Sequence, residues 1–200
     1  KAQNCAVLEP ERIKRVSGAL LAGQTVRYWS PWPVAGETPA GVKKADPPEA
    51  ADFALTLTPQ GGALHLVPRI GVLGVGCRRG TTARQLEEAF AAFCAASGLS
   101  PAAVCAAASI DLKKDEPGLA AFCKAHGWPI TFYPADELRA VPGQFTPSAF
   151  VASVTGVDNV CERSAVKASG GTLLLPKTAG GGVTLALAVR PFAPDWRTEQ

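Results

Sequence analysis

The second half of the chain alternates between apolar runs and helical stretches, which is the pattern of an α/β domain. Residues 70–75 form a continuous apolar run that ends in glycine, as expected for a strand covered on both faces. Residues 81–97 follow as a helix, because their apolar side chains recur on one stripe and Gly98 suits the C-cap. The pattern therefore predicts a strand, a glycine-rich loop and a helix in succession.

The rest of this half continues in the same way. It contains predicted strands at 104–110 and 130–133, predicted helices at 118–126 and 159–168, and an antiparallel hairpin of 172–175 with 183–189. The first three strands are expected to be parallel, and the hairpin is expected at the edge of the sheet. Because buried strands need helices on both faces, we predict a three-layer α/β/α fold with a mixed sheet for residues 69–190.

The first third of the chain predicts a smaller α+β region. Residues 9–21 have a helical period, and residues 25–29 read as a strand. Proline and glycine interrupt every regular pattern in residues 30–50, which are expected to be loop. Residues 53–58 and 63–67 alternate apolar and polar side chains on either side of a turn, which predicts a hairpin. The expected division is residues 1–68, residues 69–190 and a tail at 191–200.

Composition limits the class of protein. With 200 residues, 47% of them hydrophobic and 18% charged, the chain can bury a core and is long enough for two units. The net charge of +3 is too small for a nucleic-acid-binding surface, although it would not repel a polycarboxylate ligand. No run of 18 apolar residues is present, so no membrane span and no membrane partner are expected.

The six cysteines form no Cys-x-x-Cys pair, so a zinc site or any other metal bound by the protein is not expected. Several lie in apolar stretches, where a free cysteine behaves as a small buried hydrophobe. A reducing cytoplasm fits this pattern best. The chain begins at Lys1 and contains no methionine, so it is expected to be part of a longer protein.

The first segment with candidate chemistry is GVGCRRGT, residues 74–81, where a predicted strand ends and a helix begins. Ligands of open α/β sheets bind at the carboxyl ends of strands. Gly74 and Gly76 would let the backbone approach a ligand beside Cys77, and helix-start N–H groups favour an anion. Arg78 and Arg79 add forked donors for carboxylates. The spacing does not match a dinucleotide or phosphate-binding loop. The alternative is a tight turn with two solvated arginines.

The second segment is DLKKDEPG, residues 111–118, which follows the second strand. Asp111, Asp115 and Glu116 lie beside lysines such as Lys113, so they can act as acid and base with pKa values pushed apart. The alternative is that Asp115 or Glu116 caps the helix that Pro117 opens. Parallel strands should bring this segment and residues 74–81 to one edge of the sheet.

Three later segments give weaker indications of a functional site. Residues 145–148 resemble a helix start in which Thr146 or Ser148 is the cap. Glu162 lies near another helix start, either as a favourable first-turn charge or as a functional group. Residues 176–182 are too long and rich in glycine for a tight hairpin, so they suggest mobility or ligand approach, and Lys177 can meet a carboxylate. The positions of the two histidines give a Ser-His-Asp triad little support.

Together, five segments in order, GVGCRRGT, IDLKKDEPGL, FTPSAFV, GVDNVCERSA and LLLPKTAGGGVTLALA, resemble the C-terminal domain of the cobalt-precorrin-5A hydrolase family of cobalamin biosynthesis. A stand-alone relative in the aerobic pathway shares this domain. The resemblance covers roughly residues 69–190, and residues 1–68 look like part of the central region of the longer enzyme. We expect the N-terminal domain of the family and the start of the central region to lie outside the sequence given.

The resemblance implies that water opens the ring A lactone of a cobalt corrinoid and that acetaldehyde leaves. It implies a corrinoid partner, contact with other corrin-pathway enzymes, and no cofactor other than the cobalt in the substrate. Asp115 or Glu116 would activate water, and the glycine-loop N–H groups would stabilise the oxyanion. The substrate would be bound by residues of the five segments, namely Gly74, Gly76, Cys77, Arg78, Arg79, Asp111, Lys113, Glu162 and Lys177. Two alternatives remain, a non-catalytic corrinoid carrier and an anion-binding domain unrelated to corrinoids.

Overall fold

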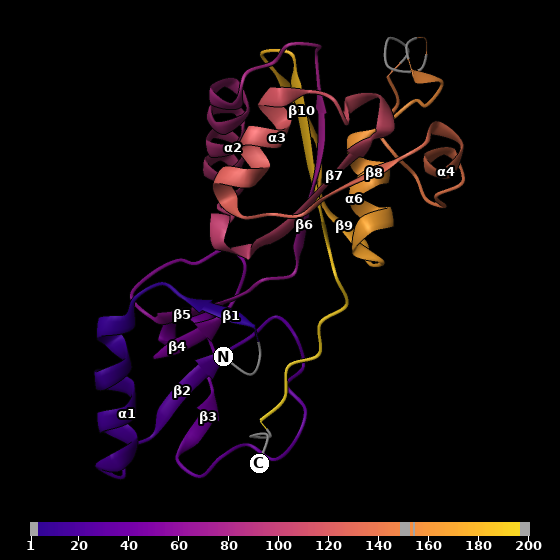
Figure 1. The fold of residues 1–200 in the computed structure, drawn as a ribbon. Helices are drawn as coiled ribbons and strands as arrows, with labels where there is room; N and C mark the ends of the chain where they lie inside the picture. Colours follow the sequence, from indigo (N-terminus) through magenta and orange to yellow (C-terminus); the bar gives the residue numbers. More distant parts are fainter. Residues whose placement is uncertain (1–3, 149–152, 154, 197–200) are drawn as a thin grey trace. The chain divides into compact units, whose positions relative to one another are not determined.

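The computed structural model describes residues 4–148, 153 and 155–196, which form two compact units (Figure 1). The first unit contains residues 1–69, 98–103 and 192–200, and the second contains residues 70–97 and 104–191, in each case as far as they are described. Both are built on five-stranded mixed sheets.

The first unit combines a sheet with helix α1. Its strands are β1 (Cys5–Val7), β2 (Val26–Trp29), β3 (Val42–Lys44), β4 (Phe53–Leu55) and β5 (Leu64–Pro68), in the order β1-β5-β4-β2-β3. Its helical segments are η1 (Pro10–Arg12), α1 (Ile13–Leu21), η2 (Pro48–Ala50) and η3 (Pro101–Ala103). β1 is antiparallel to β5, and the other neighbouring strands are parallel. The expected helix and first strand are confirmed.

The expected hairpin of residues 53–67 was wrong. Phe53 lies opposite Leu64 in a parallel register, so β4 and β5 run in the same direction. The alternation of side chains predicts both strands, but it is identical in parallel and antiparallel pairs. A tight turn cannot join two parallel strands. Within the connection, the ring of His65 contacts the carbonyl of Gln60 at 2.9 Å.

Strand β3 lies inside the segment that was expected to be loop. Val42 is opposite Val26 at the edge of the sheet, in parallel with β2. Three residues between prolines are too short to show a period, so the pattern could not reveal this strand. At the other end of the chain, Phe192 packs edge-on against Trp32 and Trp196 against Tyr28, within the same unit.

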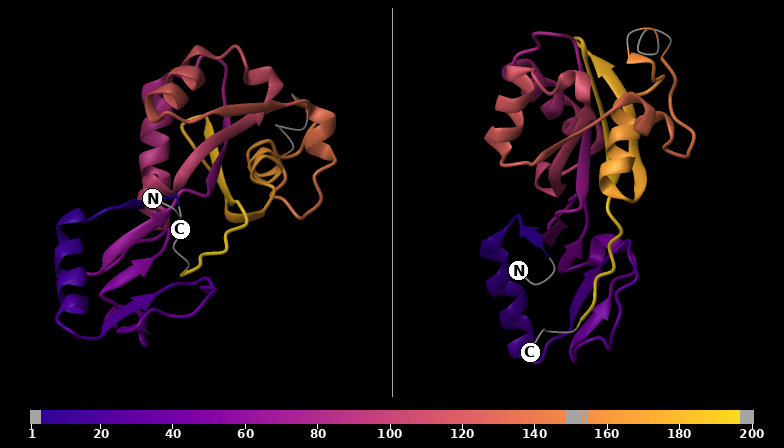
Figure 2. Two further views of the ribbon diagram at one scale, coloured as in Figure 1. Left: turned by 60° about the horizontal axis from the view of Figure 1, so that its bottom comes forward. Right: turned by 45° about the vertical axis from the view of Figure 1, so that its right-hand side comes forward.

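The second unit has the three layers that the sequence predicts. Its strands are β6 (Gly71–Cys77), β7 (Val104–Ile110), β8 (Ile130–Tyr133), β9 (Thr172–Gly180) and β10 (Val183–Val189), in the order β8-β7-β6-β10-β9. Its helical segments are α2 (Ala83–Ser97), η4 (Asp111–Lys113), α3 (Pro117–His126), α4 (Ala135–Arg139) and α6 (Cys161–Ser169). β6, β7 and β8 are parallel, and β10 is antiparallel to both of its neighbours. Helices α2 and α3 cover one face and α6 the other (Figure 2).

Small residues allow α6 to pack very close to the sheet. A Cβ atom added to Gly74 would lie 1.8 Å from the carbonyl oxygen of Cys161. Ser164 donates a hydrogen bond of 3.2 Å from its hydroxyl to the carbonyl of Ala108 on β7. Gly74 therefore serves helix packing, whereas the sequence suggested that it lets a ligand approach.

The β9–β10 hairpin is tighter than expected. Only Gly181 and Gly182 connect the strands, with φ angles of 58° and 82°, which a two-residue type I′ turn requires. The expected long loop at 176–182 was therefore wrong, because β9 continues through Pro176, which edge strands tolerate. Leu185 pairs with Thr178 while Leu187 pairs with Leu175, so β9 contains a bulge at residues 176–177.

Candidate functional site

The carboxyl edge of the parallel strands gathers the described residues of the five segments of the sequence analysis. β6 and β7 end there, α2 and α6 begin there, and the tip of the β9–β10 hairpin lies at the same end, which is the upper end in Figure 1. Two clusters of hydrogen bonds organise this edge, one around Glu116 and one around Glu162.

Glu116 joins the two loops that follow β6 and β7. Its Oε2 accepts a hydrogen bond of 2.9 Å from the N–H of Gly80, and its Oε1 accepts one of 3.0 Å from Lys113 Nζ. The side chain of Glu116 is only 8% exposed. The Gly80 N–H and then Lys113 hold the pKa of this carboxyl below its ordinary value. Both oxygens are thus engaged, which makes Glu116 a poor base for activating water.

Glu116 also departs from the expected capping role. It occupies the position before α3, but its side chain makes no capping hydrogen bond to that helix and reaches Gly80 instead. The loops are in close contact, since a Cβ atom on Gly118 would lie 2.0 Å from the carbonyl oxygen of Thr81. The expected meeting of the two loops at one edge of the sheet is therefore observed.

The glycine loop has little capacity left for an anion. Its N–H groups donate within the protein, from Arg78 to Gly182, from Gly80 to Glu116, from Thr81 to Arg78 and from Thr82 to Gln85. These donors were expected to stabilise an oxyanion, and the protein's own acceptors occupy them. Gly76 likewise serves packing, because a Cβ atom there would lie 2.4 Å from Thr184 Oγ1.

The charged groups that remain accessible are side chains. Arg78, Arg79, Lys114 and Asp115 are exposed, and their side chains make no hydrogen bond or ion pair with any residue that the structure describes. The stem of Arg78 lies against Gly182 at the hairpin tip. Asp111 is half-buried at the start of η4. These guanidinium and ammonium groups can bind carboxylates at the edge of the sheet.

Glu162 forms the second cluster and is completely buried. Its Oε1 accepts hydrogen bonds from Lys177 N–H at 2.6 Å and from the Thr146 hydroxyl at 2.9 Å. Its Oε2 accepts from Thr146 N–H and from Asn159 Nδ2, both at 2.7 Å. All four acceptor positions are filled, so Glu162 cannot contact a ligand, although the sequence suggested that it binds substrate.

Lys177 belongs to the same cluster through both of its nitrogens. Its ammonium donates to the carbonyl oxygen of Thr146 at 3.1 Å and to that of Pro147 at 3.4 Å. The sequence did not reveal Thr146 and Asn159 as partners of Glu162, because residues 145–148 resemble a helix N-terminus and suggested a local cap. The neighbouring residues 149–152 and 154 lie outside the described part of the chain.

The two cysteines of this edge are protonated thiols at neutral pH. Burial raises the pKa of Cys161 to about 11, and burial also raises the pKa of Cys77. Neither thiol is therefore an activated nucleophile. All six cysteines are free thiols, and the described residues contain no group of three or more side chains suited to hold a metal ion.

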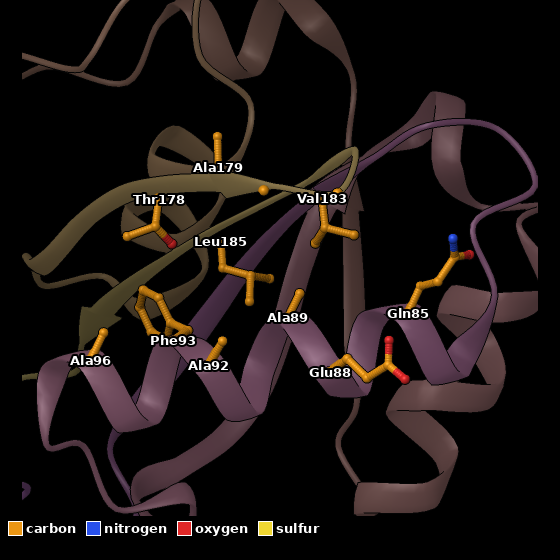
Figure 3. A pocket seen from close by; sticks show the side chains of 12 residues that line it. Gln85, Glu88, Ala89, Ala92, Phe93, Ala96, Thr178, Ala179, Val183 and Leu185 are labelled. Carbon is orange, nitrogen blue, oxygen red and sulfur yellow. The ribbon is translucent and has the colours of Figure 1, made fainter.

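A separate groove of about 460 Å³ lies between α2 and the β9–β10 hairpin (Figure 3). Small apolar residues line much of it, including Ala89, Ala92, Ala96, Ala179, Gly180 and Gly181. None of the site residues predicted from the sequence lines this groove. The described helices include none that is long and apolar enough to cross a membrane.

Comparison with known proteins identifies related chains. The profile of the family described as Cobalamin synthesis G C-terminus matches residues 71–188. A Cobalt-precorrin-5A hydrolase of Priestia megaterium is 36% identical over 62% of this chain and 33% of its own length. The enzyme of that name from Salmonella typhimurium is 37% identical over 62% of this chain and 35% of its own. The chain thus spans about a third of the length of these relatives.

Solved structures agree with the fold. The crystal structure of CobE, a protein from the cobalamin biosynthetic pathway, has a TM-score of 0.55 at 33% identity and covers 62% of this chain and 92% of its own. A cobalamin biosynthesis protein G homolog from Sulfolobus solfataricus has a TM-score of 0.53 at 17% identity. It covers 94% of this chain and 58% of its own, and at this identity the likeness concerns the fold alone.

Proposed function

Because the chain belongs to the Cobalamin synthesis G C-terminus family of cobalamin biosynthesis, we propose that its second unit binds a cobalt corrinoid and takes part in hydrolysing the ring A lactone of cobalt-precorrin-5A. The observation that carries this proposal is the accessible cationic edge of the sheet. Arg78, Arg79 and Lys114 lie there exposed, and their charged groups make no hydrogen bond or ion pair with a described residue. A corrinoid intermediate with free acetate and propionate side chains offers matching carboxylates.

Binding would use the arginines first. A guanidinium group matches a carboxylate with two parallel N–H donors, which gives orientation as well as affinity. The main chain of Arg78 is held to the hairpin by its N–H bond of 3.0 Å to Gly182 O. Two segments distant in sequence therefore carry one binding edge, and the cobalt would enter only as part of the substrate.

Hydrolysis of the lactone needs a base for water and a donor for the oxyanion. Water adds to the lactone carbonyl, and the bond from this carbon to the ring oxygen breaks, which leaves a carboxylate and a hydroxyl group. The adjoining carbon–carbon bond then breaks, the hydroxyl oxygen becomes the aldehyde oxygen, and the two-carbon fragment leaves as acetaldehyde. Of the two carboxylates proposed as base, Asp115 is exposed, whereas Glu116 is engaged by Gly80 and Lys113. We therefore assign water activation to Asp115 and stabilisation of the oxyanion to Arg79.

A second candidate function is that of a non-catalytic corrinoid carrier. This function is favoured because the oxygens of the buried Glu116 and Glu162 carboxylates accept hydrogen bonds from the protein itself. Neither carboxylate is therefore available as a catalytic base. A carrier would also hand its ligand to other corrin-pathway enzymes in the cytoplasm. In this function the cationic edge would bind the substrate, and the chemistry would occur on another protein.

One experiment separates the two functions. The chain is incubated with cobalt-precorrin-5A, and the lactone-opened product and acetaldehyde are followed by mass spectrometry and by a coupled aldehyde assay. Turnover supports the hydrolase. Tight binding without turnover supports the carrier, and the absence of both contradicts the proposed function.

A further inference from the structure

Glu162 lies at the centre of a closed set of hydrogen bonds that joins three segments of the chain. It accepts from Thr146 in the segment before α6, from Asn159 just before the N-cap of α6, and from Lys177 on β9. Asn159 Nδ2 donates to both Glu162 and the Thr146 carbonyl, and Asn159 Oδ1 accepts from the N–H of Glu162. A buried carboxylate with four donors and no exposure has a fixed position.

The bond from Lys177 N–H to Glu162 explains the bulge of β9. Residues 176 and 177 of β9 face the single residue Ala186 of β10, because the register shifts between Leu185 and Leu187. Proline has no N–H to donate, and the Lys177 N–H leaves the ladder and points to Glu162 at 2.6 Å. The carboxylate thus takes up the donor that the bulge releases.

The Lys177 ammonium is held at the same time. Two of its three N–H donors are directed at the carbonyl oxygens of Thr146 and Pro147, at 3.1 and 3.4 Å. The position of the Thr146 carbonyl depends in turn on Glu162, which accepts both the N–H and the hydroxyl of Thr146. Among the described residues no other acceptor meets the ammonium, so its third donor can bind a ligand.

We infer that Glu162 is a positioning residue, which fixes the bulge of β9 and the Thr146 carbonyl so that the Lys177 ammonium binds one carboxylate of the corrinoid. Glu162 itself touches no ligand. The identity of the ligand rests on the proposed function, whereas the positioning of Lys177 rests on the hydrogen bonds alone. A lysine tethered in this way loses less side-chain freedom on binding than a solvated one.

The test compares two cobalt corrins that differ in charge. Cobyrinic acid carries free carboxylate side chains, and cobinamide carries amides in their place. Dissociation constants for both are measured with the full chain and with Lys177→Met, Glu162→Gln and the double variant. Lys124→Met, which removes an exposed charge from the last turn of α3, is the matched control.

Lys177→Met should weaken cobyrinic acid binding about tenfold to a hundredfold, the loss of one charge-assisted hydrogen bond, and leave cobinamide binding unchanged. Selectivity is the ratio of the dissociation constants of cobinamide and cobyrinic acid. Glu162→Gln should lower this ratio by a similar factor, and the double variant should bind cobyrinic acid no more weakly than Lys177→Met does. Amide hydrogen exchange at Lys177 should accelerate in Glu162→Gln. If Glu162 only stabilised the fold, Glu162→Gln would bind both corrins less in proportion to its unfolded fraction, and the ratio of the two dissociation constants would not change.

The inference is overturned if folded Glu162→Gln keeps the selectivity for cobyrinic acid, or if its Lys177 amide stays protected. Should Glu162→Gln fail to fold, Thr146→Val takes its place, since it removes only the hydroxyl donor to Glu162 Oε1. A smaller loss of selectivity is then expected, and an unchanged ratio contradicts the inference. If the wild-type chain binds neither corrin, the proposed function fails, and exchange at Lys177 alone decides the positioning role.

Discussion

The carboxylate of Glu116 accepts a hydrogen bond of 2.9 Å from the backbone N–H of Gly80, and the two residues are 36 positions apart in the sequence. This bond joins the loop after β6 to the loop after β7. It uses a donor of the loop before α2 that an anionic ligand would otherwise meet. The protein's own carboxylate therefore occupies this position, and the side chains of the neighbouring Arg78 and Arg79 remain exposed.

Replacing Glu116 with glutamine should reduce stability more than catalysis. The amide nitrogen of glutamine cannot accept from Lys113, so a buried interaction is lost, and the free energy of unfolding should fall by about 1 to 3 kcal/mol. Urea denaturation measures this change. Asp115→Asn is the control in the same loop, because Asp115 is exposed, and its stability should remain within about 0.5 kcal/mol of wild type. Equal changes in both variants would contradict the role of Glu116.

Asp115→Asn should instead lose turnover. If Asp115 activates water, its amide variant should hydrolyse cobalt-precorrin-5A about a hundredfold more slowly and bind it normally. Single-turnover kinetics and a dissociation constant, measured on the same preparation, separate the two effects. Normal turnover in Asp115→Asn together with lost turnover per folded molecule in Glu116→Gln would reverse the assignment.

The low pKa of Glu116 makes part of the stability dependent on pH. Since the folded-state pKa lies below the ordinary value, this contribution is fully present above the unfolded pKa of about 4.3 and is lost as the pH falls through the folded pKa. The difference in melting temperature between wild type and Glu116→Gln should therefore shrink between pH 6 and pH 3. A difference that stays constant over this range would show that the Glu116 charge does not contribute to stability.

Gly74→Ala tests the close packing of α6 on β6. The new methyl group would lie 1.8 Å from the Cys161 carbonyl oxygen, so the helix must shift. We expect a loss of at least about 1 to 3 kcal/mol in urea denaturation. Gly180→Ala is the matched control, because nothing lies within 4 Å of its Cβ position and its φ angle is ordinary. A stable Gly74→Ala variant would contradict the observed distance between helix and sheet.

The architecture of the second unit could be predicted from the sequence because its strands and helices differ in period. The apolar run at 70–75 can only be a buried strand, and the apolar stripe at 81–97 can only be a helix. Because buried strands need helices on both faces of the sheet, the three layers follow. In the first unit the same reasoning found β2, β4 and β5 but missed the three-residue strands β1 and β3, and it paired residues 53–58 and 63–67 in the wrong direction. Alternation carries no information about strand direction.

The roles of the site residues were harder to predict, for a physical reason. Glu116 and Glu162 looked like first-turn charges or catalytic groups because sequence shows a carboxylate without its partners. Their donors come from Gly80, Thr146 and Lys177, which only the folded chain brings within reach. Lys177 was found from its place beside glycines, but the glycines turned out to form the hairpin turn.

The central claim is that the accessible cations at the carboxyl edge bind the carboxylates of a corrinoid, and the dissociation constant of cobyrinic acid for an Arg78→Met, Arg79→Met double variant tests it most directly. Methionine keeps an aliphatic stem over Gly182, so the fold should be preserved. Loss of the charged hydrogen bonds should weaken binding by about a hundredfold or more at an unchanged melting temperature. A double variant that binds cobyrinic acid as tightly as wild type would contradict the account and locate the corrinoid site elsewhere.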